Sequence, residues 1–108
     1  ERQNNGIGNL SIKRNQSGFN CTHLLNVLYK QNIHVIYIEG GGITLSGFIK
    51  SKALDILQLH YAPIIMGSGI SCFKLPEIDQ VDHAHSFSYH QFEAMGDESM
   101  FTGVLNYK

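Results

Sequence analysis

Hydrophobic residues recur along this chain first at helical and then at strand-like spacing, and the two patterns together predict a mixture of helices and strands. Between residues 24 and 28 the apolar side chains form one helical stripe. Asn20 or Thr22 is expected to cap this helix, because either side chain has an oxygen that accepts a hydrogen bond from an N–H group of the first turn. We expect the helix to end near Asn32.

The segment 33–38 is almost entirely apolar and rich in β-branched residues. That composition is typical of a central strand covered on both faces, as in a parallel sheet. The segment leads into Glu39 and a run of glycines at 40–42. Apolar residues between 45 and 49 then lie at i, i+3 and i+4, which predicts a short amphipathic helix after the glycines.

A second strand is predicted over residues 54–66, with its pairing weakened at Pro63, because proline has no N–H group to donate. The glycine-rich residues 67–69 predict a turn. At the other end of the chain, residues 1–18 are polar and interrupted by glycine, so we expect a loop there with a short strand at 10–12.

The last third of the chain predicts an antiparallel hairpin, with strands at 85–93 and 99–107 joined by the Gly96-Asp97 pair. The whole order of helix, strand, glycine run, helix and strand favours an α/β fold. The expected sheet is mixed and mostly parallel, is flanked by helices, and ends in the antiparallel hairpin. The chain of 108 residues is long enough for a single domain over 1–108, or for the C-terminal part of one.

Charge and cysteine content narrow the classes of function. Only 16% of the residues are charged and the formal net charge is −1. This balance gives no general electrostatic attraction to nucleic acid or to an anionic membrane, and the apolar stretches are too short to span a bilayer. Cys21 and Cys72 form no CxxC motif, which suits a reducing compartment, so we expect a cytoplasmic protein without a signal peptide.

The glycine run is the strongest candidate for chemistry. It follows a predicted strand and precedes a predicted helix, where free N–H groups and the helix dipole favour a phosphate. Thr44 and Ser46 could add hydroxyl donors. The run is not a P-loop, because Phe48 and Ile49 stand where that motif has Lys and Ser or Thr, and it lacks the GxGxxG spacing. A tight turn that binds no ligand is the alternative interpretation.

The histidines give a weaker signal. His83 and His85 form an H-x-H pair near Asp79 and Asp82, but no further motif completes a zinc site, so no metal is predicted. The zinc-deaminase signature, H-x-E followed by P-C-x-x-C, does not occur in the sequence. The aromatic residues of the last third have strand spacing, and we expect them in the core or at a subunit interface.

The region 24–69 resembles the C-terminal half of the reductase domain of riboflavin biosynthesis, which is the second half of a bifunctional deaminase/reductase and has a dihydrofolate-reductase-like fold. The shared features are the EGGG sequence at 39–42, an acidic residue at Asp55, the Ala-Pro pair at 62–63 and the glycine turn at 67–69. The resemblance implies a cytoplasmic oxidoreductase. It also implies that the chain is the C-terminal part of that domain and that it forms a homo-oligomer or associates with the missing N-terminal half.

The resemblance also implies roles for individual residues. NADPH would bind at the glycine turn and the start of the following helix, at Gly41, Gly42, Ile43, Thr44, Leu45, Ser46 and Gly47. Glu39 would face the substrate, a phosphorylated pyrimidine whose ribosyl group is reduced to a ribityl chain. A carboxylate in this place could instead only accept backbone hydrogen bonds and stiffen the turn. No catalytic residue is assigned.

Dihydrofolate reductases carry a comparable glycine pair with a cis peptide bond, so the resemblance implies one at Gly40–Gly41 or at Gly41–Gly42. Two other functions remain open at this point. One is a dihydrofolate-reductase-like enzyme that acts on another pterin or pyrimidine. The other is a module that binds nucleotides or forms oligomers without turnover.

Overall fold

The computed structural model describes residues 10–16 and 18–107, and the chain divides into two compact units between Glu39 and Gly40. The predicted loop at 1–18 lies largely outside the described residues.

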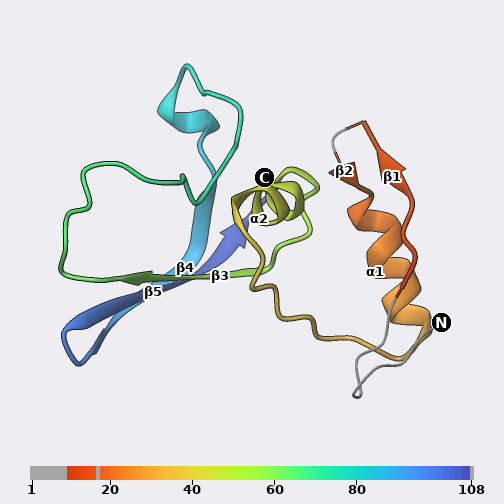
Figure 1. Ribbon diagram of the computed structural model, residues 1–108, viewed down its shortest axis with the longest axis horizontal. Helices are drawn as coiled ribbons and strands as arrows, with labels where there is room; N and C mark the ends of the chain where they lie inside the picture. The colour runs from red at the N-terminus through yellow and green to blue at the C-terminus, as the bar shows by residue number, and fades with distance from the viewer. Residues whose placement is uncertain (1–9, 17, 108) are drawn as a thin grey trace. The chain divides into compact units, whose positions relative to one another are not determined.

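The first unit contains a small hairpin and one helix (Figure 1). Strand β1 (Arg14–Asn15) pairs antiparallel with β2 (Gly18–Phe19), and α1 (Cys21–Lys30) follows directly. Residues 10–12 are in no strand, so the strand predicted there is wrong. The paired residues begin two positions further on, at Arg14.

Helix α1 confirms the first predicted helix and its cap. The Asn20 side chain accepts a hydrogen bond from the His23 N–H at 3.0 Å. Cys21 is buried at 4% exposure. The helix ends at Lys30, and Asn32 follows it with a φ of 63°, a left-handed conformation that asparagine tolerates better than most residues.

The strand predicted at 33–38 is wrong. These residues carry no strand assignment, and Val35 and Tyr37 are 89% and 79% exposed. A segment of this composition forms a strand when neighbouring strands satisfy its N–H and C=O groups and other side chains cover its faces. No strand in the described part of the chain pairs with it.

The second unit contains α2 (Gly42–Lys50), β3 (Ile56–Tyr61), the 3₁₀ turn η1 (Val81–His83), β4 (Ser86–Met95) and β5 (Glu98–Asn106). The strands form a sheet in the order β3-β5-β4, and both pairs are antiparallel (Figure 1). The predicted α/β character is confirmed, but a mostly parallel sheet is wrong for the described residues. A parallel pair would have required the segment 33–38 to join the sheet as a strand.

The predicted C-terminal hairpin is confirmed, with β4 and β5 joined at Gly96, whose φ is 63°. Strand β3 is shorter than the predicted 54–66 and stops at Tyr61. Pro63 lies two residues beyond its end. Because proline has no N–H group, it could not donate a hydrogen bond if the strand continued there.

One face of the sheet carries most of the core of this unit. A register shift between Phe87 and Tyr89 turns Phe87 to the same face as Phe101, and their rings meet edge to face with centroids 5.0 Å apart. Gly103 lies beneath them, and a Cβ atom there would be 2.5 Å from the Phe87 ring. Together with Ile49 of α2, Phe87 and Phe101 line an apolar pocket of about 350 Å³.

The C-terminal end of the unit is tied to the residues before β3. The Tyr107 hydroxyl donates a hydrogen bond to the Leu54 carbonyl oxygen at 2.8 Å. Burial raises the pKa of Tyr107 above its usual value, and the nearby Asp55 carboxylate raises it further.

Candidate functional site

The predicted cofactor site lies at the start of α2. Gly41 is the residue before the first helical turn, with φ −66° and ψ −179°, an extended conformation open to any residue. The peptide bonds on either side of Gly41 are trans, because the described residues contain no cis peptide bond. The cis bond expected at Gly40–Gly41 or Gly41–Gly42 is therefore wrong, and this turn keeps the peptide isomer of lower energy.

The first turn of α2 presents unused hydrogen-bond donors. The Leu45 N–H is the first in the helix to bond backward, to the Gly41 carbonyl at 3.1 Å. The N–H groups of Gly42, Ile43 and Thr44 come before it and have no acceptor among the described residues. Gly41 has no side chain to cap them. The helix start can therefore accept an anionic or hydrogen-bond-accepting group from outside the chain.

The glycines at this turn and in α2 differ in how much space a side chain would have. A Cβ atom at Gly40 would lie 3.1 Å from the Thr44 Cβ, and one at Gly42 would lie 2.7 Å from the Ser71 carbonyl oxygen. A Cβ atom at Gly41 or Gly47 would meet nothing within 4 Å. Of these four glycines, Gly42 is therefore the one that backbone atoms approach most closely, and a side chain there would clash with them.

The atoms that approach Gly42 belong to residues 71–74, here called the strap. A Cβ atom at Gly42 would also lie 3.0 Å from the Cys72 carbonyl oxygen. At its other end, the strap is held by α2, because the Lys74 N–H donates to the Ser46 Oγ at 2.7 Å. Within the strap, the Ser71 hydroxyl donates to the Phe73 carbonyl oxygen at 3.0 Å. The strap therefore borders the open helix start.

The predicted site residues differ in their exposure. Ile43 is 67% exposed and Gly41 is also exposed, whereas Ser46 is buried at 1% exposure. Thr44 is half-buried, as are its helix neighbours Leu45 and Gly47. The structure thus brings the predicted residues 41–47 together on one turn and helix.

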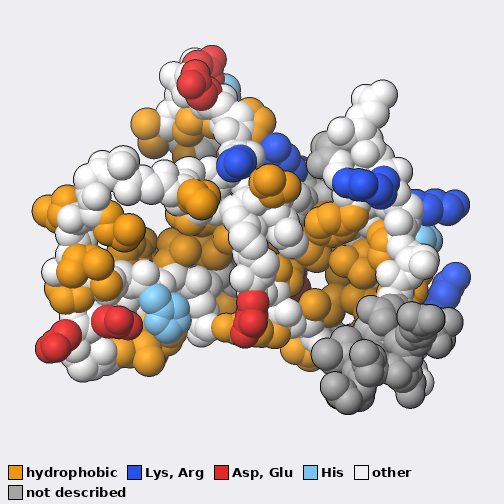
Figure 2. All heavy atoms as spheres, viewed as in Figure 1, with side chains coloured by type: hydrophobic (Ala, Val, Ile, Leu, Met, Phe, Trp, Pro, Cys, Tyr) orange, Lys and Arg blue, Asp and Glu red, His pale blue; other side chains and the backbone are white. Residues whose placement is uncertain are grey.

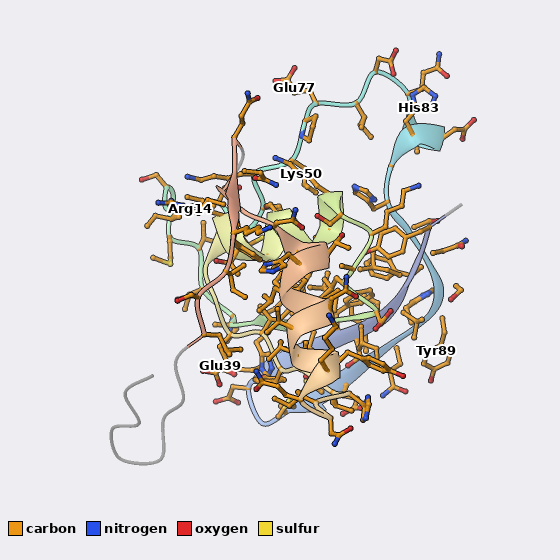
Figure 3. All side chains as sticks on the ribbon, turned by 90° about the vertical axis from the view of Figure 1, so that its right-hand side faces the viewer. Arg14, Glu39, Lys50, Glu77, His83 and Tyr89 are labelled. Carbon is orange, nitrogen blue, oxygen red and sulfur yellow. The ribbon has the colours of Figure 1, made fainter. Side chains whose placement is uncertain are left out.

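Glu39 is the last residue of the first unit, and its side chain is exposed. The sequence places it directly before the glycines, and Figure 3 shows it labelled on its segment. The pattern of the sequence did not reveal the strap. Residues 71–74 carry no motif, and only the fold brings Lys74 to Ser46, which lies 28 positions earlier.

The H-x-H region forms a local contact. The Nδ1 atom of His83 lies 2.9 Å from the carboxylate of Asp79, four residues earlier in the chain, and both side chains are largely exposed. Figure 3 shows His83 on η1 and Glu77 on the loop that leads to it. In the part of the chain that the structure describes, no group of three or more His, Cys, Asp or Glu side chains could hold a metal ion. None of its helices is long and apolar enough to cross a membrane.

The helices and the antiparallel sheet define an α/β protein. Its glycine turn begins a helix whose first N–H groups are free, and this turn is a candidate site for an anion or a nucleotide. Comparison with known families makes this specific. The family model described as "RibD C-terminal domain" matches residues 2–99. The chain belongs to this family, which confirms the resemblance drawn from the EGGG turn and its surroundings.

Individual relatives agree. The chain is 39% identical over 81 residues to the riboflavin biosynthesis protein RibD of Aquifex aeolicus (strain VF5), covering 75% of this chain and 22% of that protein. It is 32% identical over 73 residues to the riboflavin biosynthesis protein RibD of Corynebacterium ammoniagenes, covering 64% of this chain and 22% of that protein. The matched region thus spans 22% of the length of each of these relatives.

Proposed function

We propose that this chain is part of an NADPH-dependent reductase of riboflavin biosynthesis. The reaction proposed is reduction of the ribosyl group of 5-amino-6-(5-phosphoribosylamino)uracil to a ribityl chain. The observation that carries the proposal is the match of residues 2–99 to the RibD C-terminal domain, in which the glycine turn leaves the start of α2 open. The low net charge and the unpaired cysteines suit an enzyme of the cytoplasm.

The residues at the start of α2 fit a dinucleotide phosphate. The free N–H groups of Gly42, Ile43 and Thr44 would donate to phosphate oxygens, and the Thr44 hydroxyl would add a donor. Gly41, Leu45, Ser46 and Gly47 would complete the turn and the first part of the helix around the cofactor. When bound, the cofactor would supply the hydride, and the protein groups would supply binding and orientation.

We propose that Glu39 contacts the substrate. Its carboxylate is exposed, and it can accept hydrogen bonds from the amino and N–H groups of an aminopyrimidine. The Glu39→Gln variant keeps the size of the side chain and removes its charge. If Glu39 only stiffens the turn, this variant will bind substrate as well as the wild type. Direct contact predicts a higher KM for the pyrimidine and an unchanged Kd for NADPH.

The proposal is tested first by titrating the full chain with NADPH and following the fluorescence of the reduced nicotinamide, with NADH in a parallel titration. Saturable binding that is tighter for NADPH is expected. Absence of saturable binding of either cofactor would leave the non-catalytic module as the function of this chain. Turnover is then measured on the phosphoribosylaminopyrimidine and on dihydrofolate. Reduction of dihydrofolate alone would replace the proposal with a different dihydrofolate-reductase-like enzyme.

We also propose that apolar side chains on the outside of the second unit pack against another polypeptide surface, either a second copy or a further part of the reductase domain. Support comes from the loop after β3, where Ile65 and Ile70 are 98% and 94% exposed. Figure 2 shows hydrophobic side chains gathered over this loop. Sedimentation analysis of the chain should show a dimer or larger species, and replacement of Ile65 and Ile70 by serine should shift it to monomer. A monomeric wild type would exclude the homo-oligomer.

A further inference from the structure

Ser46 stands out in the second unit because it is a polar side chain with 1% exposure. Burying a hydroxyl without a partner is unfavourable, and here the partner is the backbone of the strap. The Lys74 N–H donates to the Ser46 Oγ at 2.7 Å, a short and therefore well-formed bond. The hydroxyl of Ser46 is thus engaged by the protein itself.

The same side of α2 holds the other end of the strap by close packing. A Cβ atom at Gly42 would lie 2.7 Å from the Ser71 carbonyl oxygen and 3.0 Å from that of Cys72. Gly42 and Ser46 are separated by one helical turn, so they lie on the same face of α2. The strap is therefore fixed to the helix at two points, by contact at Gly42 and by a hydrogen bond at Ser46.

We infer that Ser46 is a positioning residue for the cofactor site, which it shapes through the strap and not by binding a phosphate. This inference rests on the proposed function, because the site concerned is the NADPH site at the start of α2. Release of the Lys74 N–H would let the strap move away from Gly42. The wall beside the free N–H groups of Gly42 and Ile43 would then lose its fixed position, and cofactor affinity would fall.

Cys72 provides a direct readout of the strap. It is a free, exposed cysteine within the strap, whereas the other cysteine, Cys21, is free and buried. Alkylation by iodoacetamide, followed for each cysteine by mass spectrometry, therefore reports the strap through Cys72 and general unfolding of the first unit through Cys21. Thermal unfolding monitored by circular dichroism checks that each variant is folded as a whole.

The experiment compares Ser46→Ala, Ser46→Thr and Ser51→Ala in the full chain. Ser51 is an exposed serine at the opposite end of the same helix, so it controls for loss of a hydroxyl. We expect Ser46→Ala to weaken NADPH binding by up to about tenfold, the equivalent of one hydrogen bond. Its Cys72 alkylation rate should rise several-fold. Ser46→Thr, which keeps the acceptor oxygen, and Ser51→Ala should both stay close to wild type.

In wild type, saturating NADPH is expected to slow alkylation of Cys72, and in Ser46→Ala this protection should be reduced. Weaker NADPH binding by Ser46→Ala with an unchanged Cys72 rate would mean that Ser46 contacts the cofactor, which overturns the inference. NADPH binding that leaves Cys72 alkylation unchanged would place the strap away from the site and overturn it as well. Because the extra methyl group of threonine enters a site with 1% exposure, Ser46→Thr is judged together with Cys72. Loss of NADPH binding in Ser46→Thr with Cys72 alkylation as slow as in wild type would exclude a role for the hydrogen bond.

Failure of the proposed function gives a different result. In that case wild type itself shows no saturable NADPH binding. Both the proposed cofactor site and the role of Ser46 in that site are then rejected. The alkylation rates of Cys72 in Ser46→Ala and Ser51→Ala would still show whether Ser46 holds the strap.

Discussion

The two helices of this chain begin in opposite ways. In α1 the Asn20 side chain accepts a hydrogen bond from the His23 N–H at 3.0 Å. In α2 the corresponding residue is Gly41, which has no side chain, and no side-chain cap bonds the first turn. Both helices carry a lysine in the last turn, Lys30 and Lys50, so their ends are alike in this respect.

This difference indicates which helix start is available for a ligand. A capping side chain stabilises a helix by about 1 kcal/mol relative to alanine and by only a few tenths of a kcal/mol relative to glycine, and α2 forgoes that smaller contribution. In exchange, its first N–H groups remain free and its turn admits close contact with other atoms, as the strap carbonyls near Gly42 show. In α1 the cap stabilises the helix start. In α2 the uncapped N–H groups remain available as donors to an anion.

The largest expected effect is at Gly42. In Gly42→Ala the new Cβ would lie 2.7 Å from the Ser71 carbonyl oxygen, which is backbone, so the helix or the strap must shift. We expect the free energy of unfolding to fall by about 1–3 kcal/mol, as for other overpacked sites. Chemical denaturation of the variant measures this.

Gly47→Ala is the matched control, because a Cβ at position 47 would meet nothing within 4 Å. Alanine is the better helix former by about 1 kcal/mol, so this variant should be more stable than wild type. The same substitution should thus lower the free energy of unfolding at position 42 and raise it at position 47. Equal effects would show that the strap does not press on Gly42.

The sequence predicted local features well. The apolar stripe of 24–28 and the polar residue before it identified α1 and its Asn20 cap, and the glycine-aspartate pair identified the β4–β5 hairpin. These features depend on neighbouring residues, whose spacing is visible in the sequence.

The errors concern contacts that depend on distant residues. The segment 33–38 has the composition of a buried strand, yet Val35 is 89% exposed, because strand formation needs partners that composition does not specify. The prediction of a mostly parallel sheet was wrong for the same reason, because it depended on this segment being a strand. The position of the glycine turn before α2 was predicted, but the strap was not, since the bond from Lys74 to Ser46 joins residues 28 positions apart.

A second prediction concerns the capped helix. Asn20→Ala removes the acceptor for the His23 N–H, and we expect a loss of about 1 kcal/mol in the free energy of unfolding. Asn20→Asp keeps a capping oxygen and serves as the control, with stability close to wild type. Because α1 is assigned no ligand, NADPH affinity should not change in either variant. An altered Kd for NADPH in Asn20→Ala would contradict the division of roles between the two helices.

The smallest expected change in stability, and the sharpest test of the comparison, comes from giving α2 the cap that it lacks. Gly41 has φ −66° and ψ −179°, and a Cβ there meets nothing within 4 Å, so Gly41→Asp fits without strain. The carboxylate would accept from an N–H group of the first turn and interact favourably with the helix dipole. Since glycine is already an acceptable residue at this position, stability should rise by only a few tenths of a kcal/mol.

The same aspartate would occupy the donors proposed for the cofactor phosphate and place a negative charge beside them. NADPH binding should therefore weaken by about tenfold or more, the effect of losing a charge-assisted hydrogen bond. Gly41→Asn, which caps without a charge, should give a smaller loss. Fluorescence titration together with denaturation separates the two effects. A variant that gains stability and keeps its affinity for NADPH would show that the open start of α2 is not where the phosphate binds.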